Sequence, residues 1–175
     1  MKPPLEGELV RLRAPEPEDE PYYYQWINDP EVTYNLLARY PFTHAQELEF
    51  IAKPSSYGYV NLTIVTLGDA LPIGNATLRN ANPENRPADL GIMIGDRAYW
   101  DRGYGTDAMR TICRFGFEVM NLHRIELDVF ADNARAIKVY ERLRFVHEGR
   151  KREAHYRRGE YVDVVTMGLL AGELR

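Results

Sequence analysis

Two glycines, Gly103 and Gly105, separate an apolar, strand-like run at 88–94 from a long helix-like run that Thr106 opens. Glycine lets the backbone turn tightly and lie against a ligand without an intervening side chain, so consecutive N–H groups can converge on one anion. A helix start adds unpaired N–H groups and the positive end of the helix dipole. The segment 100–108 therefore predicts a cradle for a phosphate or pyrophosphate. An ordinary turn followed by a helix cap is the alternative for the same residues.

The length, charge and cysteine content of the chain limit its class. With 175 residues, 45% of them hydrophobic and 27% charged, the chain is typical of one globular domain, which we place at 1–175. The net charge of −4 argues against nucleic-acid binding through a basic surface. The single cysteine, Cys113, excludes an internal disulfide and a cysteine-based zinc site, and we expect it in the core. No apolar run is long enough to span a bilayer and no signal peptide is evident, so we expect a cytoplasmic protein without membrane contact.

Hydrophobic periodicity predicts an α+β chain. Alternating and β-branched runs predict strands, and apolar residues at three-and-four spacing predict helices. The expected strands are 9–13, 59–67, 71–78, 88–94, 124–130, 145–152 and 161–170. The expected helices are 18–27, 43–53, 106–120 and 133–143, with a loop at 31–42 that contains Tyr34, Tyr40 and Phe42. These rings either line a substrate entrance or cover the edge of the core.

The glycine pair also fits the dinucleotide-binding pattern, with Ala108 in its third position and Glu126 about 20 residues further on. We reject that interpretation because residues 95–102 intervene between the strand and the glycines. The upstream strands also lack the crossover helices that a parallel sheet needs. The sequence contains no Gly-Lys-Ser/Thr phosphate loop, serine-hydrolase elbow or zinc-binding motif, so we expect no metal.

Further segments resemble the GNAT superfamily of acyl-CoA-dependent N-acyltransferases. The segment 100–105 resembles the pyrophosphate loop of that family, and 133–141 resembles its next motif, an asparagine-capped helix that carries a tyrosine. The RimJ/RimL-like branch matches best, because its features extend over nearly the whole chain, through 11–13, 26–32, 147–149 and 159–163. The resemblance implies the GNAT fold, a central, mixed, mostly antiparallel sheet flanked by helices, with acetyl-CoA as co-substrate.

Two positions depart from the family pattern. Trp100 stands where the family has arginine or glutamine, so one polar contact near the pyrophosphate is absent or comes from another group, such as Arg97 or Arg102. Arg144 stands where the family usually has glycine at a helix end. The left-handed conformation expected there costs a residue other than glycine roughly 1 kcal/mol or more, unless the helix ends differently.

The resemblance implies transfer of an acetyl group to a primary amine by direct attack within a ternary complex. The amine must first lose a proton, because alkylamines are mostly charged at neutral pH. Asp89 is the candidate base, directly or through water, since related sequences often carry an acid at this strand position; a surface carboxylate is the alternative. Tyr140 matches the family's tyrosine and is the candidate acid for the leaving thiolate; a core tyrosine on an apolar helix face is the alternative. A backbone N–H near Ile92 or Met93 is implied for the oxyanion.

The remaining implied contacts involve the co-substrate and the acceptor. The acetyl-CoA contacts are expected at Ile92, Met93, Ile94, Arg97, Arg102, Gly103, Tyr104, Gly105, Thr106 and Asn133. Trp26 and Tyr34 are the expected contacts to the acceptor, which is a protein N-terminus, a polyamine, an amino sugar or an aminoglycoside. A second hypothesis is a non-catalytic acyl-CoA-binding sensor or structural module, in which turnover does not depend on Tyr140 or Asp89. The exposed closing hairpin makes a homodimer a reasonable expectation.

Overall fold

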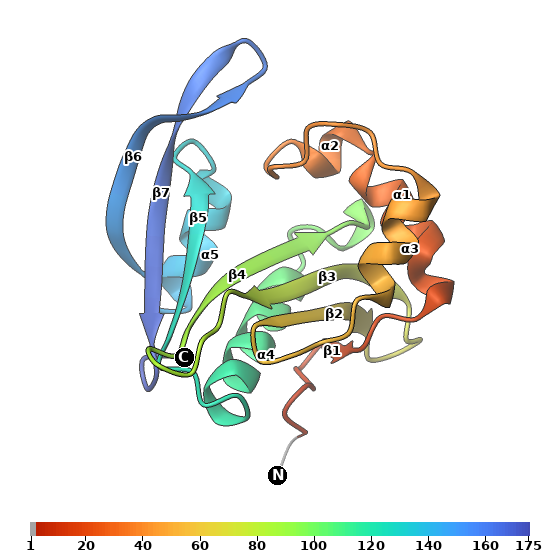
Figure 1. Cartoon of the computed structure of the whole chain (residues 1–175), viewed down its shortest axis with the longest axis horizontal. Coiled ribbons are helices and arrows are strands. Elements are labelled where there is room, and N and C mark those ends of the chain that lie inside the picture. Colours follow the sequence, from red (N-terminus) through yellow and green to blue (C-terminus); the bar gives the residue numbers. More distant parts are fainter. Residues whose placement is uncertain (1–2) are drawn as a thin grey trace.

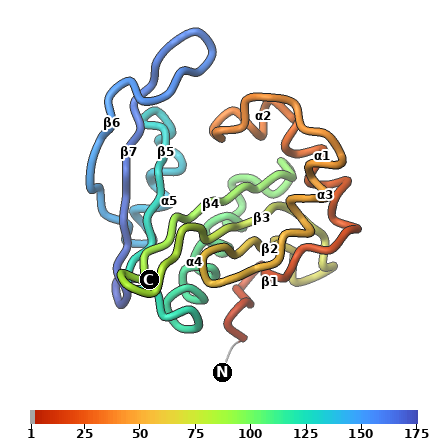
Figure 2. The backbone as a smooth tube through the Cα atoms, in the orientation of Figure 1, coloured from red at the N-terminus to blue at the C-terminus, as the bar shows by residue number. Residues whose placement is uncertain are grey.

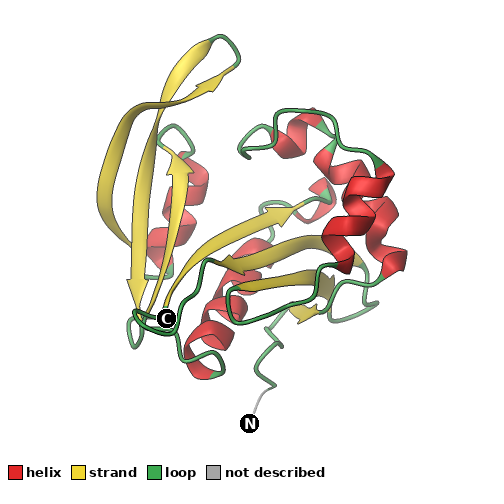
Figure 3. Cartoon of the chain, viewed as in Figure 1, coloured by secondary structure: helices red, strands yellow, loops and turns green. Residues whose placement is uncertain are grey.

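A computed structural model of the chain describes residues 3–175 and contains one seven-stranded sheet with helices on both faces (Figures 1 and 3). Its strands are β1 (Val10–Arg13), β2 (Tyr59–Thr66), β3 (Pro72–Arg79), β4 (Pro87–Ile94), β5 (Arg124–Phe130), β6 (Val146–Arg157) and β7 (Glu160–Leu170). They lie in the order β1-β2-β3-β4-β5-β7-β6, and all neighbouring pairs are antiparallel except β4 and β5. The mixed, mostly antiparallel sheet predicted above is confirmed.

The α-helices of the described chain are α1 (Glu20–Ile27), α2 (Pro30–Thr33), α3 (His44–Ala52), α4 (Tyr104–Glu118) and α5 (Ala134–Arg142). Short 3₁₀ helices precede α1 at Pro17–Asp19 and α4 at Arg97–Tyr99. The predicted loop at 31–42 thus overlaps a short helix, α2. Its N-cap Asp29 accepts a hydrogen bond from the Glu31 N–H at 2.9 Å. A helix of four residues is too short for an apolar periodicity to show in the sequence.

Different helices cover the two faces of the sheet. Leu90 of β4 lies in the main core, where the fully buried Ile112 and Cys113 of α4 also lie. Met93 of the same strand packs instead against a second cluster, which includes Trp26 of α1 and Ile51 of α3. Because successive side chains of a strand point to opposite faces, α4 covers one face of β4 and the pair α1 and α3 covers the other. The expected core position of Cys113 is confirmed.

The sheet splits between its two parallel strands. β4 and β5 pair only where Pro87–Asp89 lies beside Arg124–Glu126, although β4 continues to Ile94 and β5 to Phe130. Figure 2 shows the two strands diverging beyond this short ladder. The rest of β4 therefore has no partner strand on its β5 side, so backbone groups on that edge are available to a ligand.

Arg144 follows α5 with φ of 76°, in the left-handed region. The N–H of the next residue, Phe145, donates to the Tyr140 carbonyl at 3.0 Å, a bond typical of a helix that ends in a left-handed turn. The chain therefore ends this helix as the resemblance implies, with arginine in a conformation that favours glycine.

No helix within residues 3–175 combines the length and the apolar character that crossing a membrane requires.

Candidate active site

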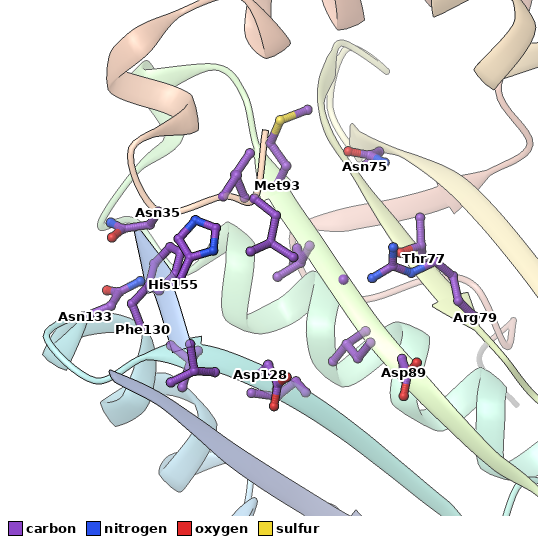
Figure 4. A pocket seen from close by; sticks show the side chains of 18 of the residues that line it. Asn35, Asn75, Thr77, Arg79, Asp89, Met93, Asp128, Phe130, Asn133 and His155 are labelled. Atoms are coloured by element: carbon purple, nitrogen blue, oxygen red, sulfur yellow. The ribbon is translucent and has the colours of Figure 1, made fainter. Parts of the chain in front are cut away.

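A cavity of about 820 Å³ occupies the split between β4 and β5 and extends under α1 and α3. Its walls come from elements far apart in the sequence, and Figure 4 shows the β3 and β4 side chains facing those of β5 and β6 across it. The structure brings together in this cavity five of the predicted catalytic and co-substrate residues, namely Asp89, Ile92, Met93, Asn133 and Tyr140, and Phe42 of the aromatic loop also lines it. The predicted catalytic pair, Asp89 and Tyr140, therefore lines one and the same cavity.

Tyr140 of α5 reaches the cavity from the β5 side. Its ring packs against Phe145, with ring centroids 6.0 Å apart. Burial raises the pKa of the Tyr140 hydroxyl to about 12, because the phenolate loses solvation. The hydroxyl therefore stays protonated at neutral pH and can donate a proton to a group in the cavity.

Asn133 sets the start of α5. Its side-chain oxygen accepts a hydrogen bond from the Ala136 N–H at 3.2 Å, so it is the helix N-cap. It also lines the cavity, as Tyr140 does two helical turns further on. Asn133 thereby sets where α5 begins and also places a polar side chain on the cavity wall.

The glycine loop lies beyond the far end of β4 and does not line the cavity. Gly103 has φ of 87° and is the N-cap of α4, which therefore begins at Tyr104 rather than at Thr106 as predicted. The first bond of the helix runs from the Asp107 N–H to the Gly103 carbonyl. The N–H groups of Tyr104, Gly105 and Thr106 precede that bond and have no acceptor within the helix, as an anion cradle requires.

Asp107 holds the start of α4 against the N-terminal strand. Its buried carboxylate accepts hydrogen bonds from three consecutive N–H groups, those of Glu8 at 3.0 Å, Leu9 at 2.8 Å and Val10 at 3.1 Å. The close approach needs glycine at position 7, where an added Cβ would lie 2.2 Å from the Asp107 carboxylate. Sequence reasoning missed this link, because its partners are about a hundred residues apart.

Trp100 ties the glycine loop to the sheet instead of supplying a charge. Its indole N–H donates to the Ile94 carbonyl at the end of β4, at 2.7 Å. The guanidinium of Arg135, in the first turn of α5, lies 5.2 Å from the Trp100 ring centroid and 3.1 Å from the carboxylate of Asp101. A cation from α5 thus reaches the glycine loop, and its place was not predicted.

The two arginines predicted near the pyrophosphate differ in where they point. Arg102 donates to the Ala98 carbonyl at 3.1 Å and remains beside the loop. Arg97 lies 3.7 Å from Asp29, at the start of α2, and so points away from the glycine loop toward α2.

Trp26 and Tyr34 take different places around the cavity. Trp26 is buried beneath β4, so close to Gly95 that an added Cβ there would lie 2.1 Å from its indole. The ring therefore supports the end of β4 and is absent from the cavity wall. Tyr34 lies at the rim, with the guanidinium groups of Arg157 and Arg158 at 4.6 and 4.4 Å from its ring centroid.

The hairpin of β6 and β7 meets the segment between α2 and α3 across this rim. Arg157 pairs with Asp132 and donates to the Asn35 side chain at 3.2 Å. Arg39 donates to the Tyr156 carbonyl at 2.9 Å. The strand predicted at 145–152 continues to Arg157 as β6, and Ala154 and His155 of this extension line the cavity.

Comparison with known proteins agrees with this architecture. Residues 10–146 match the family described as "Acetyltransferase (GNAT) domain". The chain is 31% identical over 174 residues to the uncharacterized N-acetyltransferase p20 of Bacillus licheniformis, with 97% of each chain covered. It is 33% identical over 167 residues to the L-amino acid N-acetyltransferase AaaT of Escherichia coli, with 92% of this chain and 97% of that one covered.

More distant relatives share the fold. The spermidine N(1)-acetyltransferase of Escherichia coli is 28% identical over 158 residues, which cover 90% of this chain and 84% of that protein. The crystal structure of a spermidine N-acetyltransferase from Vibrio cholerae, in complex with CoA and spermine, has a TM-score of 0.85 at 23% identity and covers 94% of this chain and 96% of that one. The family match covers residues 10–146, which is most of the chain. We conclude that this chain belongs to the GNAT acetyltransferase family and is an acyl-CoA-dependent N-acetyltransferase.

Proposed function

We propose that the protein transfers the acetyl group of acetyl-CoA to the primary amine of a small molecule, by direct attack in a ternary complex. The observation that carries this proposal is the split between β4 and β5, with a neutral tyrosine hydroxyl in the cavity and a helix start beyond the end of β4. A long acyl-CoA needs both an anion cradle and a narrow slot for its arm. Direct transfer further needs a proton donor beside the slot.

In this proposal the N–H groups of Tyr104, Gly105 and Thr106 bind the pyrophosphate. Arg135 and Arg102 lie beside that loop and supply the positive charge that is missing because Trp100 stands in place of arginine or glutamine. The pantetheine arm then follows the unpaired edge of β4 along Ile92–Ile94 toward Tyr140, and Asn133 contacts the arm from the other side. An anion bound at the start of α4 also gains from the positive end of the helix dipole.

The chemistry follows from the groups around the split. A carboxylate of the cavity wall takes a proton from the amine; Asp89 is the candidate from the sequence. The amine attacks the thioester carbon, and a backbone N–H of β4 near Ile92 or Met93 stabilises the oxyanion. Tyr140 then protonates the leaving thiolate.

Two findings support a small amine as acceptor. The named relatives include proteins called L-amino acid and spermidine N-acetyltransferases. The cavity wall also carries four carboxylates, those of Glu47, Asp89, Glu126 and Asp128, which suit a cationic acceptor. A protein N-terminus is the second candidate, because the RimJ/RimL-like branch acetylates protein N-termini as well as small amines, and one relative is called a putative ribosomal N-acetyltransferase of Bacillus subtilis.

The proposal is tested first by calorimetric titration with acetyl-CoA beside NADH. We expect acetyl-CoA alone to bind, and Gly103→Val to weaken binding at least tenfold, because valine disfavours φ of 87° and covers the N–H groups. Release of CoA thiol is then measured with spermidine, an L-amino acid, an amino sugar, an aminoglycoside and a short peptide. Binding without thiol release from any of these amines would favour the non-catalytic acyl-CoA-binding module instead.

A further inference from the structure

Four carboxylates line the cavity, and three of them are held by neighbouring side chains. The pairs are Glu126 with Arg124 at 2.6 Å, Asp128 with Lys151 at 2.6 Å, and Asp89 with the amide of Asn80. Each of these three has a donor that lowers the cost of its charge. The fourth, Glu47 of α3, has neither an ion pair nor a side-chain hydrogen bond within residues 3–175.

Glu47 is also the most enclosed of these carboxylates. The residue is 5% exposed, although it lies on the cavity wall. It stands one helical turn before Phe50 and Ile51, on the face of α3 that packs against Met93 of β4. Its carboxylate therefore lies on the α1 and α3 face of β4, beside the part of β4 after Asp89 that does not pair with β5.

The groups packed around Glu47 cannot supply the missing partner. Glu20 of α1 repels it and already binds His44, whose ring nitrogen lies 2.7 Å away. The Thr63 hydroxyl donates its proton to Asp19, so it accepts the hydrogen bond from the Tyr23 hydroxyl of α1 at 2.9 Å. The Tyr23 proton is therefore not available to Glu47. Burial and the charge of Glu20 together raise the pKa of Glu47.

The other charged groups of the cavity belong to other walls. Arg79 of β3 and Asp89 lie toward the base of the split, and His155 lies on the β6 side (Figure 4). Lys151 also belongs to β6, where it pairs with Asp128. Asp89 stands four residues before Met93, and four strand residues span about 13 Å. A carboxylate at that distance does not touch an amine that attacks a thioester held beside Met93.

We propose that Glu47 binds the ammonium group of the acceptor and takes its proton before the attack. This inference rests on the proposed acetyl transfer and assigns its first step to a residue of α3. The proton moves from the ammonium nitrogen to a Glu47 oxygen, which frees the nitrogen lone pair to form the bond to the thioester carbon. When the C–S bond breaks, its electron pair leaves on sulfur, and Tyr140 protonates the thiolate. The phenolate regains a proton from the acetylated nitrogen, and Glu47 returns its proton to solvent.

The acceptor class follows from the same geometry. An amine that enters as an ammonium ion supplies the counter-ion that Glu47 lacks, and its N–H groups satisfy the carboxylate oxygens. A neutral or anionic acceptor group leaves the enclosed charge unpaired, which is costly. The site therefore selects alkylammonium acceptors at this position over alcohols or thiols of the same size.

The first test needs no turnover. Carboxyl ¹³C NMR of glutamate-labelled protein follows the titration of Glu47, whose signal is assigned by its loss in Glu47→Gln. Methylammonium chloride is the probe, and tetramethylammonium chloride is the control, since it carries the same charge without an N–H donor. We expect an elevated pKa for Glu47 that methylammonium lowers and tetramethylammonium leaves unchanged. An ordinary pKa, or equal responses to the two cations, would overturn the proposal.

The second test is kinetic. In Glu47→Gln we expect kcat/KM for spermidine to fall by about 100-fold or more, with loss of the acidic limb of its pH profile and an acetyl-CoA Kd within about twofold of the native value. Glu49→Gln, which removes an exposed carboxylate of the same helix, is the matched control and should keep full activity. Asp89→Asn should cost less than Glu47→Gln.

The outcomes separate this inference from the proposed function. If the native protein turns over an amine and Glu47→Gln keeps both its kcat/KM and its pH profile, the assignment of Glu47 is wrong and acetyl transfer stands. If the native protein binds no acetyl-CoA, the proposed function fails, and the NMR titration still decides whether Glu47 binds an ammonium ion.

Discussion

Replacing Tyr140 by phenylalanine removes one oxygen from the cavity and little else. The ring contact with Phe145, at 6.0 Å between centroids, is kept, so the fold should be preserved. With a pKa of about 12, only about one tyrosine in ten thousand is ionised at pH 8, and the native hydroxyl is a ready proton donor. A positioned general acid contributes about 100-fold to 10,000-fold to a rate. We expect kcat to fall at least about 100-fold, with an unchanged Kd for acetyl-CoA.

The assay is the release of CoA thiol, followed with a thiol-reactive chromophore at saturating acetyl-CoA between pH 6 and pH 10. Because the pKa of the Tyr140 hydroxyl is about 12, the hydroxyl stays protonated up to pH 10. Ionisation of Tyr140 should therefore cause no loss of native activity within this range. A kcat of Tyr140→Phe within about threefold of the native value would refute the acid role. Tyr140 would then be a core tyrosine of α5 that happens to border the cavity.

Further predictions concern stability and the co-substrate. Arg144→Gly should raise the melting temperature by about 2–4 °C in calorimetry, since it relieves about 1 kcal/mol of left-handed strain. Asp107→Asn should lower the free energy of unfolding in urea by about 2–4 kcal/mol, because an amide cannot accept from all three N–H groups; a loss under 1 kcal/mol would contradict this. Arg135→Ala should weaken acetyl-CoA binding severalfold in low salt and less in high salt, whereas Lys138→Ala, an exposed change on the same helix, should not. The raised pKa of Glu47 gives stability that is present below the ordinary glutamate pKa and lost as pH rises through the raised value, so Glu47→Gln should become more stable than the native protein toward pH 8 in thermal unfolding.

Most of the sheet could be predicted because the evidence for a strand is local. The alternating run at 124–130 and the β-branched run at 59–67 became β5 and β2 with nearly the expected bounds. The alternation of apolar and polar residues indicates which side chains of a strand face the core, and it can be recognised without knowing the partner strand. The split between β4 and β5 could not be found in this way, since it depends on how far two parallel strands stay paired.

The same distinction applies to the site. The glycine loop was found because a left-handed residue before a helix is specified within a few residues, as Gly103 shows. Trp26 was expected beside the acceptor from its place in a family motif, yet the absence of a side chain at Gly95 lets β4 lie directly on its ring. That contact joins residues about seventy positions apart, so it cannot be predicted from the sequence around either residue.

Glu47 shows why one carboxylate of a site can escape notice while another is selected. In the sequence it is one of two acidic residues, with Glu49, on an amphipathic helix, where a solvated surface is the usual location. Glu47 differs in its surroundings: Asp128 pairs with a lysine and Glu126 with an arginine, whereas within residues 3–175 Glu47 has no cationic partner and is repelled by Glu20. An enclosed charge without a partner destabilises the protein on its own, and it is useful where a cationic ligand completes the site. The absence of a partner inside the cavity is therefore the positive evidence for an ammonium acceptor.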